Sequence, residues 1–470
     1  MATAASSSPS ATARGPRGTL LLGNLRAYLH DPLGYMVEMP RQYGPVVRLR
    51  LLQTPYYVVA HPDGVQRILH DNARNYLRAP QVIDPVKVSF GAGLLVTEGA
   101  PYLRHRRMMQ PIFHHRHVQT FAELMAHQTA TLLTAWEAPA QRGERVDVAA
   151  AMKRLALAIV TRALFSADLD RTADAQVLSA ANDTLNDAAF RRAMYYPVYP
   201  PPAVPTPHNR RFRAAARHLD HLVYRLIAAR RAQCDTQSNN AASDSATDLL
   251  SLLIEARDAE TGEGMTDRQI RDEALNLIFA GHDTVANALT WTFYLLSQHP
   301  TVFRRLQAEL AATLGGRTPG VADLPHLPYT RMVIEESLRL YPPAWVITRR
   351  AIHDDELGGY HIPAGATVMF SPYAMHHNAR YWDNPEGFDP ERFTPERSTG
   401  RPAFAYFPFG GGPHLCIGNG FAMTEAQLIL ATVAQRYRLD LVPGHPVVPE
   451  PLVTLSTRYG LLVTLHPAED

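Results

Sequence analysis

The chain has 470 residues, and 46% of them are hydrophobic, enough to bury a large core. Basic and acidic residues nearly cancel, and the formal net charge of +2 excludes a protein that binds polyanions over its whole surface. The only cysteines are Cys234 and Cys416, which argues against a disulfide framework and fits a reducing, cytoplasmic setting.

The N-terminal residues are small, polar and Pro-containing, and we expect residues 1–19 to form a disordered leader. They lack the apolar core of a signal peptide. The next apolar piece, Leu20 to Leu22, is far too short to span a bilayer. We therefore expect no membrane anchor.

The remaining residues, 20–470, predict one large, mainly α-helical domain with a small β-rich region. Val-, Leu- and Tyr-rich stretches predict short strands within 44–60, 358–375 and 451–465. Helical periodicity of the apolar residues predicts helices at 118–136, 148–165, 209–232, 247–257, 266–298 and 301–314.

Two breaks interrupt the helical pattern. Residues 195–207 are Pro-rich and apolar, an unusual composition for a solvent loop, and we interpret them as an apolar lid. Residues 234–248 are polar and read as a loop. Long amphipathic helices flank both breaks, so we interpret them as insertions rather than domain boundaries.

The longest predicted helix begins after Thr266, because Gln269 stands at the capping-box spacing from it. Its middle carries Gly281, Asp283 and Thr284. One interpretation is a local opening of the helix, where the Thr284 hydroxyl holds water and relays protons. The other is a kinked core helix whose glycine serves packing and whose polar residues are incidental.

Cys416 follows Phe409 and the glycines Gly410, Gly411 and Gly412, and an apolar helical run comes after it. Glycines let the backbone approach a flat ligand closely. A cysteine near a helix start favours the thiolate, which is a metal ligand. Haem iron held by a single thiolate is one interpretation. A buried cysteine in a glycine turn is the alternative.

Two further segments carry charged residues in apolar surroundings. Glu336 and Arg339 stand three apart on a predicted helix that ends at Pro342, so they share a face. Arg392 could join them in a buried network. Most such pairs are ordinary surface ion pairs of little energetic weight.

Together these motifs resemble the cytochrome P450 family, and they occur in the order that the family has. The segment 409–418 matches its haem-ligand signature, and Glu336 and Arg339 match its Glu-x-x-Arg motif. Arg392 matches the third member of that triad, and the oxygen-activation motif is matched by Ala280, Gly281, Asp283 and Thr284. The resemblance covers essentially everything from residue 20 onward.

The resemblance implies a bacterial-type soluble monooxygenase with haem b, whose axial ligand is the Cys416 thiolate. Asp283 and Thr284 would be catalytic and deliver protons for O2 activation. The enzyme would insert one atom of O2 into a C–H bond, with electrons from NAD(P)H through a ferredoxin or similar donor and its reductase. A peroxide-driven enzyme remains an alternative, although it often lacks the acid–Thr pair, and so does a non-catalytic haem sensor.

The resemblance also implies the residues that hold the haem. Beside Cys416, those expected to contact it are Phe409, Gly410, Ala280, Tyr102, Arg106, His414 and Arg349. Tyr102 stands where the family usually has Trp, and a phenol can still donate one hydrogen bond to a propionate. Arg350 is the alternative to Arg349 for the propionate contact.

The substrate pocket is expected to be apolar, which suits a lipophilic molecule with few polar groups, a terpenoid or a fatty acid slightly favoured. Its expected lining is Val82, Ile83, Val86, Ile278, Ala344, Val346 and Ile347. The basic run from Arg104 to Arg116 has two interpretations, a solvated helix face or a docking surface for an acidic ferredoxin. Basic residues interleaved with aromatics over a broad field are not evident, so we expect no nucleic-acid binding.

Overall fold

A computed structural model of the chain describes residues 11–166, 173–196, 198–237 and 248–468. Its contacts divide the chain into two compact units. Unit 1 takes its described residues from Met1–Ala79, Leu338–Gly387 and Pro395–Cys416. Unit 2 takes its described residues from Pro80–Ser337, Phe388–Thr394 and Ile417–Asp470. A single domain over residues 20–470 stays a prediction.

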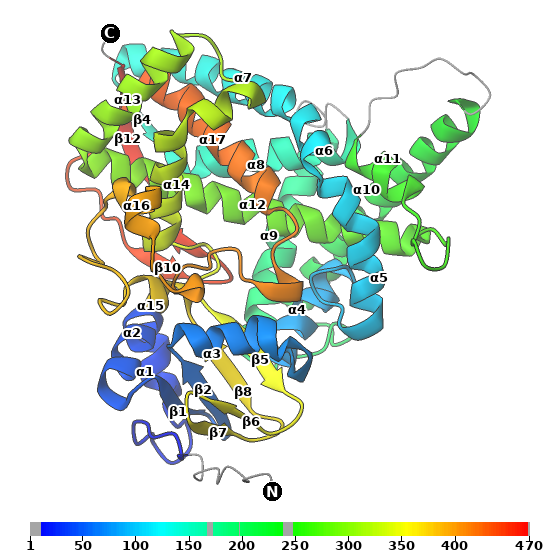
Figure 1. Cartoon of the computed structure of the whole chain (residues 1–470). Coiled ribbons are helices and arrows are strands. Elements are labelled where there is room, and N and C mark those ends of the chain that lie inside the picture. Colours follow the sequence, from blue (N-terminus) through cyan, green and yellow to red (C-terminus); the bar gives the residue numbers. More distant parts are fainter. Residues whose placement is uncertain (1–10, 167–172, 197, 238–247, 469–470) are drawn as a thin grey trace, which may run out of the picture. The chain divides into compact units, whose positions relative to one another are not determined.

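Unit 1 is built on a five-stranded sheet in the order β1-β2-β8-β5-β3 (Figure 1). Strands β1 (Val46–Leu51) and β2 (Thr54–Val59) form an antiparallel hairpin, and β8 (Thr367–Phe370) pairs in parallel with β2. Antiparallel β5 (Ile347–Ala351) and β3 (Tyr76–Arg78) complete the sheet. The strands expected within 44–60 and 358–375 are confirmed. All of β8 is buried, and three of its four residues are apolar, as in a strand covered on both faces.

Unit 1 also contains short helices and a separate two-stranded sheet formed by β6 and β7. They are α1 (Leu25–His30), α2 (Pro32–Tyr43), α3 (Pro62–Gln66), β6 (Asp355–Leu357), β7 (Tyr360–Ile362), α15 (Pro372–His376) and α16 (Pro395–Ser398). A core cluster of unit 1 includes Val46, Val59, Val368 and Phe370.

Residues 11–19, which we expected to belong to a disordered leader, are instead bonded to unit 1. The Ala11 N–H donates to the Gly359 carbonyl at 2.8 Å, and the Arg48 N–H donates to the Arg14 carbonyl at 2.9 Å. Ala13 is buried in the apolar core. These contacts let a small, polar sequence follow an ordered path. Residues 1–10 lie outside the described residues.

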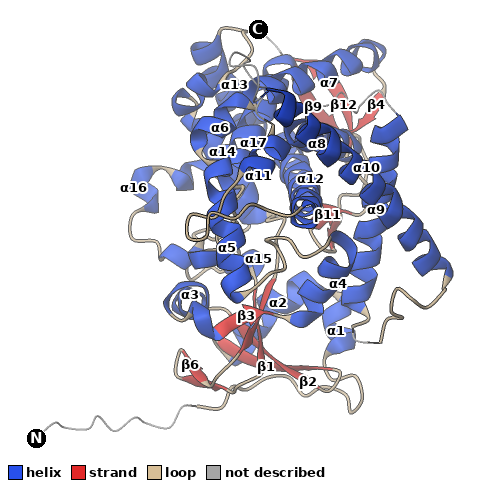
Figure 2. Cartoon of the chain, turned by 90° about the vertical axis from the view of Figure 1, so that its right-hand side faces the viewer, coloured by secondary structure: helices blue, strands red, loops and turns tan. Residues whose placement is uncertain are grey.

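Unit 2 is mainly helical (Figure 2). Its helices before the long central one are α4 (Pro80–Phe90), α5 (Gly99–Met109), α6 (His115–Thr120), α7 (Ala122–Arg142), α8 (Val148–Phe165), α9 (Ala173–Met194), α10 (Pro207–Gln237) and α11 (Leu249–Glu255). The later ones are α12 (Asp267–Gln298), α13 (Pro300–Leu314), α14 (Pro328–Leu340), whose last residues fall in unit 1, and α17 (Asn419–Arg436). The six helices expected from periodicity are confirmed, with boundaries shifted by a few residues. Cys234 falls within α10 rather than in a polar loop.

Helix α12 is the long central helix, and its predicted capping box is confirmed. Thr266 accepts a hydrogen bond from the Gln269 N–H, and the Gln269 side chain accepts from the Thr266 N–H. Of the two interpretations of this segment, the local opening at Gly281 is wrong, because the helix continues through it from Asp267 to Gln298. A Cβ on Gly281 would lie 3.2 Å from Val160 Cγ2, so the glycine lets α8 pack closely beside α12 (Figures 1 and 2).

Small sheets complete unit 2. Strands β4 (Arg145–Asp147), β12 (Leu462–Pro467) and β9 (Tyr437–Leu441) form one sheet, and β10 (Pro449–Pro451) pairs with β11 (Leu455–Thr457). This confirms the C-terminal strands. Trp291 on α12 donates its indole N–H to the Leu455 carbonyl at 3.0 Å, which joins the helix core to this strand. Within the described residues, we find no helix with the length and apolar character needed to cross a bilayer.

Candidate functional site

The loop that carries Cys416 needs glycine for steric reasons. Gly410 and Gly412 have φ of 72° and 63°, a region that costs other residues about 1–2 kcal/mol. A Cβ on Gly412 would also lie 1.8 Å from the Leu69 carbonyl oxygen, where no side-chain atom fits. The Cys416 N–H donates to the Phe409 carbonyl at 3.0 Å, which closes the loop. The cysteine is exposed, so the alternative of a buried cysteine in a glycine turn is wrong.

A buried arginine in unit 1 holds the backbone that precedes this loop. Arg339 is 0% exposed, and its Nη1 donates to the carbonyls of His376 at 2.8 Å and Pro385 at 2.7 Å. Its Nη2 donates to the Gly387 carbonyl at 2.9 Å. The guanidinium also lies over the Trp382 ring, with Cζ 5.2 Å from the ring centroid. A planar guanidinium can bridge several carbonyls in this way, whereas a lysine cannot.

His376 links Arg339 to the cysteine loop, and sequence reasoning missed it. Its Nε2 accepts the Phe407 N–H at 3.1 Å, and the Phe407 carbonyl accepts the Gly410 N–H at 3.0 Å. Because Nε2 accepts, Nδ1 carries the proton and donates to the Arg339 carbonyl at 3.2 Å. Burial, together with the nearby Arg339 charge, holds the pKa of His376 well below its usual value, so the ring stays neutral.

The other two members of the predicted triad meet in unit 2. Arg392 Nε lies 2.9 Å from Glu336 Oε1, and that oxygen also accepts the Asp389 N–H at 3.0 Å. Glu336 and Arg392 are 0% and 3% exposed, so the ion pair is buried rather than a surface pair. A buried pair of this kind is costly to break, because removing one partner leaves the other charge without compensation.

Helix α12 presents its acid–Thr pair in unit 2. Thr284 Oγ1 donates to the Ala280 carbonyl at 2.6 Å, a bond of the Thr hydroxyl to the preceding turn of its own helix. Asp283 Oδ2 accepts from Asn186 Nδ2 at 3.0 Å, and Lys153 Nζ lies 3.8 Å from Asp283 Oδ1. Lys153 and Asn186 come from α8 and α9, and no sequence pattern pointed to them.

His282 lies on the buried side of the same helix. It is 4% exposed, and its Nδ1 lies 3.2 Å from Asn182 Nδ2. Burial lowers the pKa of His282, while Asp283 and Asp183 oppose that shift. Ala280, in contrast, is exposed, and Asp283 and Thr284 are half-buried. The middle of an otherwise buried helix therefore offers a short accessible face.

The expected propionate residues come from both units. On α5, Tyr102 is 3% exposed and Arg106 is half-buried, one helical turn apart. On β5, Arg349 is buried and Arg350 is exposed, because successive strand residues point to opposite faces. Arg349 Nη1 donates to the Thr348 carbonyl at 3.0 Å. His414 is half-buried in the cysteine loop.

The expected substrate-lining residues also divide between the units. In unit 2, α4 carries Val82, which is 45% exposed, and the more covered Ile83 and Val86, while Ile278 on α12 is buried. Phe90 and Phe279, which we did not expect, join α4 to α12 with ring centroids 4.5 Å apart. In unit 1, Ala344 is exposed, and Val346 and Ile347 are half-buried.

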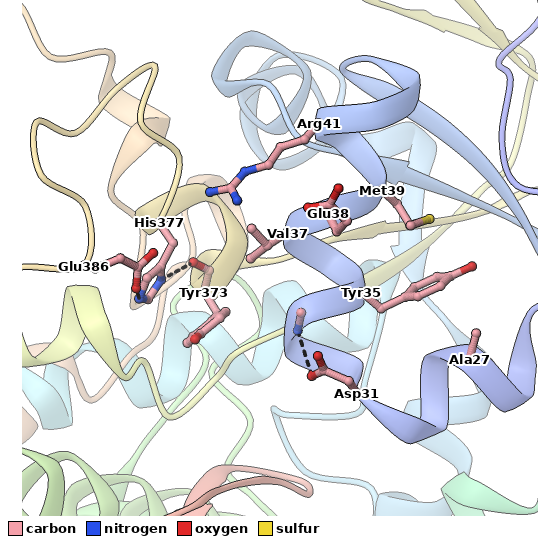
Figure 3. Close-up of a pocket in the computed structure, with 11 residues that line it drawn as sticks. Ala27, Asp31, Tyr35, Val37, Glu38, Met39, Arg41, Tyr373, His377 and Glu386 are labelled. Carbon is pink, nitrogen blue, oxygen red and sulfur yellow. Dashed lines mark hydrogen bonds and ion pairs between the residues drawn. The ribbon is translucent and has the colours of Figure 1, made fainter.

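A pocket of about 490 Å³ in unit 1 contains none of the expected site residues (Figure 3). Helix α2 lines one side, and Tyr373, His377 and Glu386 line the other. His377 donates from Nδ1 to the Tyr373 carbonyl at 2.8 Å. Burial lowers the pKa of His377 to about 4. The pocket therefore holds a neutral imidazole, with no part in the predicted chemistry.

Part of the basic run on α5 is neutralised within unit 2. Arg107 Nε lies 3.1 Å from Asp258 Oδ1, and its Nη2 lies 2.9 Å from Glu260. Arg104 Nη2 lies 3.4 Å from Glu263. These arginines present less positive charge to a partner than the sequence alone indicated.

The surroundings of Cys416 fit an iron bound in haem better than a metal ion that only protein side chains coordinate. Within the described ranges, no group of three His, Cys, Asp or Glu side chains could hold a metal ion. An iron held by Cys416 therefore needs its other ligands from elsewhere, and a porphyrin supplies them. Cys416 is exposed, and the glycines beside it carry no side chain, so a flat ring can come close to the thiolate.

Comparison with known proteins agrees with this geometry. The cytochrome P450 family model matches residues 13–463. Cyclooctatin synthase of Streptomyces melanosporofaciens is 37% identical over 94% of this chain and 93% of its own length. Cyclooctat-9-en-7-ol 5-monooxygenase of the same organism is 36% identical, with 93% and 91% covered.

Pentalenene oxygenase of Streptomyces avermitilis is 33% identical, with 94% of each chain covered. Among solved structures, the haem domain of cytochrome P450DA superposes with a TM-score of 0.85 at 24% identity, covering 98% of this chain and 99% of that one. At that identity the likeness concerns the fold, and it confirms the mainly α fold expected from the sequence. The chain belongs to the cytochrome P450 family, and it is a haem-thiolate monooxygenase.

Proposed function

We propose that the enzyme hydroxylates a terpenoid, with electrons from a ferredoxin and its reductase. The proposal rests on two relatives, a cyclooctat-9-en-7-ol 5-monooxygenase and a pentalenene oxygenase. Each matches this chain over more than nine tenths of its length. The apolar residues on α4 and at β5 support the same substrate class, since a lipophilic ligand is bound mainly by apolar contacts.

Cys416 is the residue that holds the haem iron in this proposal. Haem bound through a thiolate supplies O2 activation and the insertion of one oxygen atom into a C–H bond. The task of the protein is to keep the thiolate in one place. The bonds from Arg339 through His376 and Phe407 to Gly410 do this by fixing the backbone in front of the loop.

Asp283 and Thr284 deliver protons in the proposed reaction. Asn186 and Lys153 hold the Asp283 carboxylate from two sides, and Lys153 is the more exposed of the two. A carboxylate in contact with a solvated ammonium can exchange protons with water, and the Thr284 hydroxyl next to it can pass them on.

The remaining expected contacts hold the haem itself. Tyr102, Arg106, Arg349 and His414 would donate hydrogen bonds to its propionates, and burial of Arg349 supports it over the exposed Arg350. Phe409, Gly410 and Ala280 would lie against the ring. Gly410, with φ of 72°, brings backbone close to a flat ligand without a side chain.

In this proposal, a ferredoxin supplies the electrons to the iron. The chain has just two cysteines, too few for an internal four-thiolate iron–sulfur cluster. His114 and Arg116, which follow α5 in the basic run, are exposed, and an acidic ferredoxin could dock there.

A ligand panel tests the substrate class. Diterpene and sesquiterpene hydrocarbons and alcohols, with fatty acids of similar length as the matched set, are screened for displacement of the iron-bound water in the haem spectrum. The terpenoids should shift the spectrum at lower concentrations and be hydroxylated only with NADPH, ferredoxin, reductase and O2. Preference for the fatty acids would contradict the terpenoid proposal. Equal turnover with hydrogen peroxide alone would contradict the monooxygenase route.

A further inference from the structure

Two buried carboxylates of α12 hold the segment 90–97, which runs from the end of α4 towards α5. The Ala92 N–H donates to Asp272 Oδ2 at 2.9 Å, and the Leu94 N–H donates to Glu273 Oε2 at 3.0 Å. Asp272 is 5% exposed and Glu273 is 0% exposed. Hydrogen bonds to a carboxylate are stronger than those between neutral groups, so the backbone of this segment is firmly bound to α12.

Two glycines let the segment come this close to the helix. A Cβ on Gly91 would lie 2.1 Å from Asp272 Oδ1, and a Cβ on Gly93 would lie 2.6 Å from Asn276 Cγ. Asn276, which is 3% exposed, donates from Nδ2 to the Phe90 carbonyl at 3.1 Å. The backbone therefore lies directly against polar side chains of α12, and a larger residue at either glycine would push it away.

Each carboxylate uses its second oxygen to bind a further side chain of unit 2. Glu273 Oε1 lies 2.6 Å from Nδ1 of His105 on α5, and His105 is 5% exposed. Asp272 Oδ1 accepts from Arg271 Nη1 at 2.7 Å, and Arg271 Nε donates to Asp220 Oδ1 on α10 at 2.8 Å. Both carboxylates are thus hydrogen-bonded through both oxygens, which restricts their movement.

The segment lies beside the face of α12 that leads to the acid–Thr pair. Asn276, Ala280 and Thr284 follow one another at intervals of four residues, so they share one side of the helix. Ala280 is exposed and Thr284 is half-buried. The Phe90 ring packs against Phe279, the residue before Ala280, with ring centroids 4.5 Å apart. The segment therefore borders the accessible face of α12 from its N-terminal side.

The segment also presents an apolar side chain. Leu95 is 36% exposed, whereas its neighbours Leu94 and Val96 are 8% and 5% exposed. The backbone bond of Leu94 to α12 fixes the position from which the Leu95 side chain projects. An apolar group held in this way suits contact with a lipophilic ligand.

We propose that Asp272, Glu273 and Asn276 are positioning residues, which fix segment 90–97 as one wall of the substrate site and so select the substrate by size. They act without touching the substrate, because they are buried and bonded to the segment itself. A wall that is already fixed need not be ordered when a ligand binds, which preserves affinity for a ligand that reaches it. The inference rests on the proposed position of the haem against Ala280, and it does not depend on the terpenoid class.

Azole ligands of two sizes test the proposal, because both bind haem iron and only the larger one reaches the wall. The full-length, haem-loaded protein is titrated with imidazole and with 4-phenylimidazole, and binding is read from the shift of the Soret band. In the unchanged protein, 4-phenylimidazole should bind about tenfold more tightly or better, because its phenyl ring is buried against apolar side chains. Equal affinities for the two azoles would contradict a wall beside the haem.

The double variant Asp272→Asn, Glu273→Gln keeps the shape of both side chains, but each amide has one acceptor oxygen where the carboxylate has two. It should reduce the preference for 4-phenylimidazole about tenfold and leave imidazole binding within about twofold. Hydrogen exchange of the peptide 90–97 should become faster in the same variant. The control variant Glu255→Gln, Asp267→Asn changes two exposed acids of unit 2 and should alter neither measurement.

A second pair of variants tests the contact from the side of the segment. Gly93→Ala places its Cβ against the Asn276 side chain and should reduce the azole preference to a similar degree. Asn276→Ala removes the atoms that this Cβ would meet. Adding Gly93→Ala to Asn276→Ala should therefore change the preference by less than about twofold.

The haem spectrum and Tm show that each variant is folded. An unchanged azole preference in a variant whose segment exchanges faster, or equal losses for both azoles, would overturn the proposal and leave these residues a purely structural role. A haem-loaded protein whose iron binds neither azole would contradict the proposed haem position, and this inference with it.

Discussion

The cysteine loop of unit 1 and the acid–Thr segment of unit 2 are built in opposite ways. In the backbone that precedes Cys416, charged and polar groups are buried and hydrogen-bonded. Arg339 is 0% exposed, and His376 is neutral. Around Asp283 the partners are half open to water, and Lys153 is exposed. A metal ligand that must stay in one position, such as the Cys416 thiolate, is thus held by a backbone with buried hydrogen bonds. A group that must exchange protons keeps contact with solvent.

The largest expected effect comes from Arg339→Ala. Three backbone carbonyls lose their donor in a buried site, and a loss of about 3–5 kcal/mol is expected by analogy with broken buried charge networks. The protein should fail to retain haem, as measured by absorbance and bound iron after purification. Arg74→Ala, at an exposed position of the same unit, is the control. Normal haem content in Arg339→Ala would show that the cysteine loop does not need the hydrogen bonds of Arg339.

Gly412→Ala tests the loop itself. The new Cβ meets the Leu69 carbonyl and the backbone has φ of 63°, so a loss of about 2–4 kcal/mol is expected from overpacking and strain together. Thermal unfolding and haem retention measure it. Gly418→Ala is a matched control, because nothing lies within 4 Å of its Cβ position and its φ is −91°. Equal effects of the two changes would contradict the steric argument.

Asp283→Asn tests the proposed proton delivery in unit 2. The amide keeps the shape but cannot relay a proton, so product formation should fall by about 100-fold while haem content and Tm stay unchanged. Oxygen consumed without product and the solvent isotope effect on turnover separate proton delivery from substrate binding. Full activity with an unchanged isotope effect would exclude Asp283 from the relay.

His377 gives the buried region of unit 1 a pH dependence. Its folded pKa of about 4 lies below the ordinary value of 6.5, so between these values the unfolded state binds the extra proton. Stability is therefore complete above pH 6.5 and falls as the pH drops towards 4, by up to about 1.4 kcal/mol per pH unit. Urea unfolding at several pH values measures it. His377→Gln should reduce this slope, to which the buried His376 still contributes, and the exposed His353→Gln should leave it unchanged; equal slopes in the two would contradict the assignment.

The smallest effect is expected for Lys153→Met. The Lys153–Asp283 ion pair is half exposed at 3.8 Å, and such pairs contribute about 0–1 kcal/mol. Turnover should fall only a few-fold, and added salt should reduce the difference from the unchanged enzyme. Arg154→Met, at the next exposed position of α8, serves as the control. A loss as large as that of Asp283→Asn would mean that Lys153 is part of the relay.

The sequence predicted the elements with strong local signals. Helix α8 was predicted residue for residue, and the Thr266 capping box was correct, because apolar period and cap chemistry are local properties. The motif residues around Cys416, Glu336 and Thr284 could be proposed from the sequence because short motifs occur together in the order that the family has, and their individual roles stay predictions. For Gly281 the sequence left two interpretations open, and only the tertiary contact with Val160, which no local pattern shows, favours the packing role.

Partners contributed by distant segments could not be predicted. His376 acts on Phe407, and Asn186 acts on Asp283 from another helix. Each is an ordinary residue type without a motif, and only the fold brings it to its partner. The same holds for residues 11–19, whose polar composition predicted disorder although their backbone finds partners in unit 1.

The central claim is that Cys416 holds the haem iron as a thiolate. The most direct test reduces the purified protein, adds carbon monoxide and records the Soret band of the wild type and of Cys416→Ala. We predict the red-shifted band of a thiolate-ligated haem in the wild type and its loss in the variant. Absence of that band in the wild type, or its survival in Cys416→Ala, would contradict the assignment.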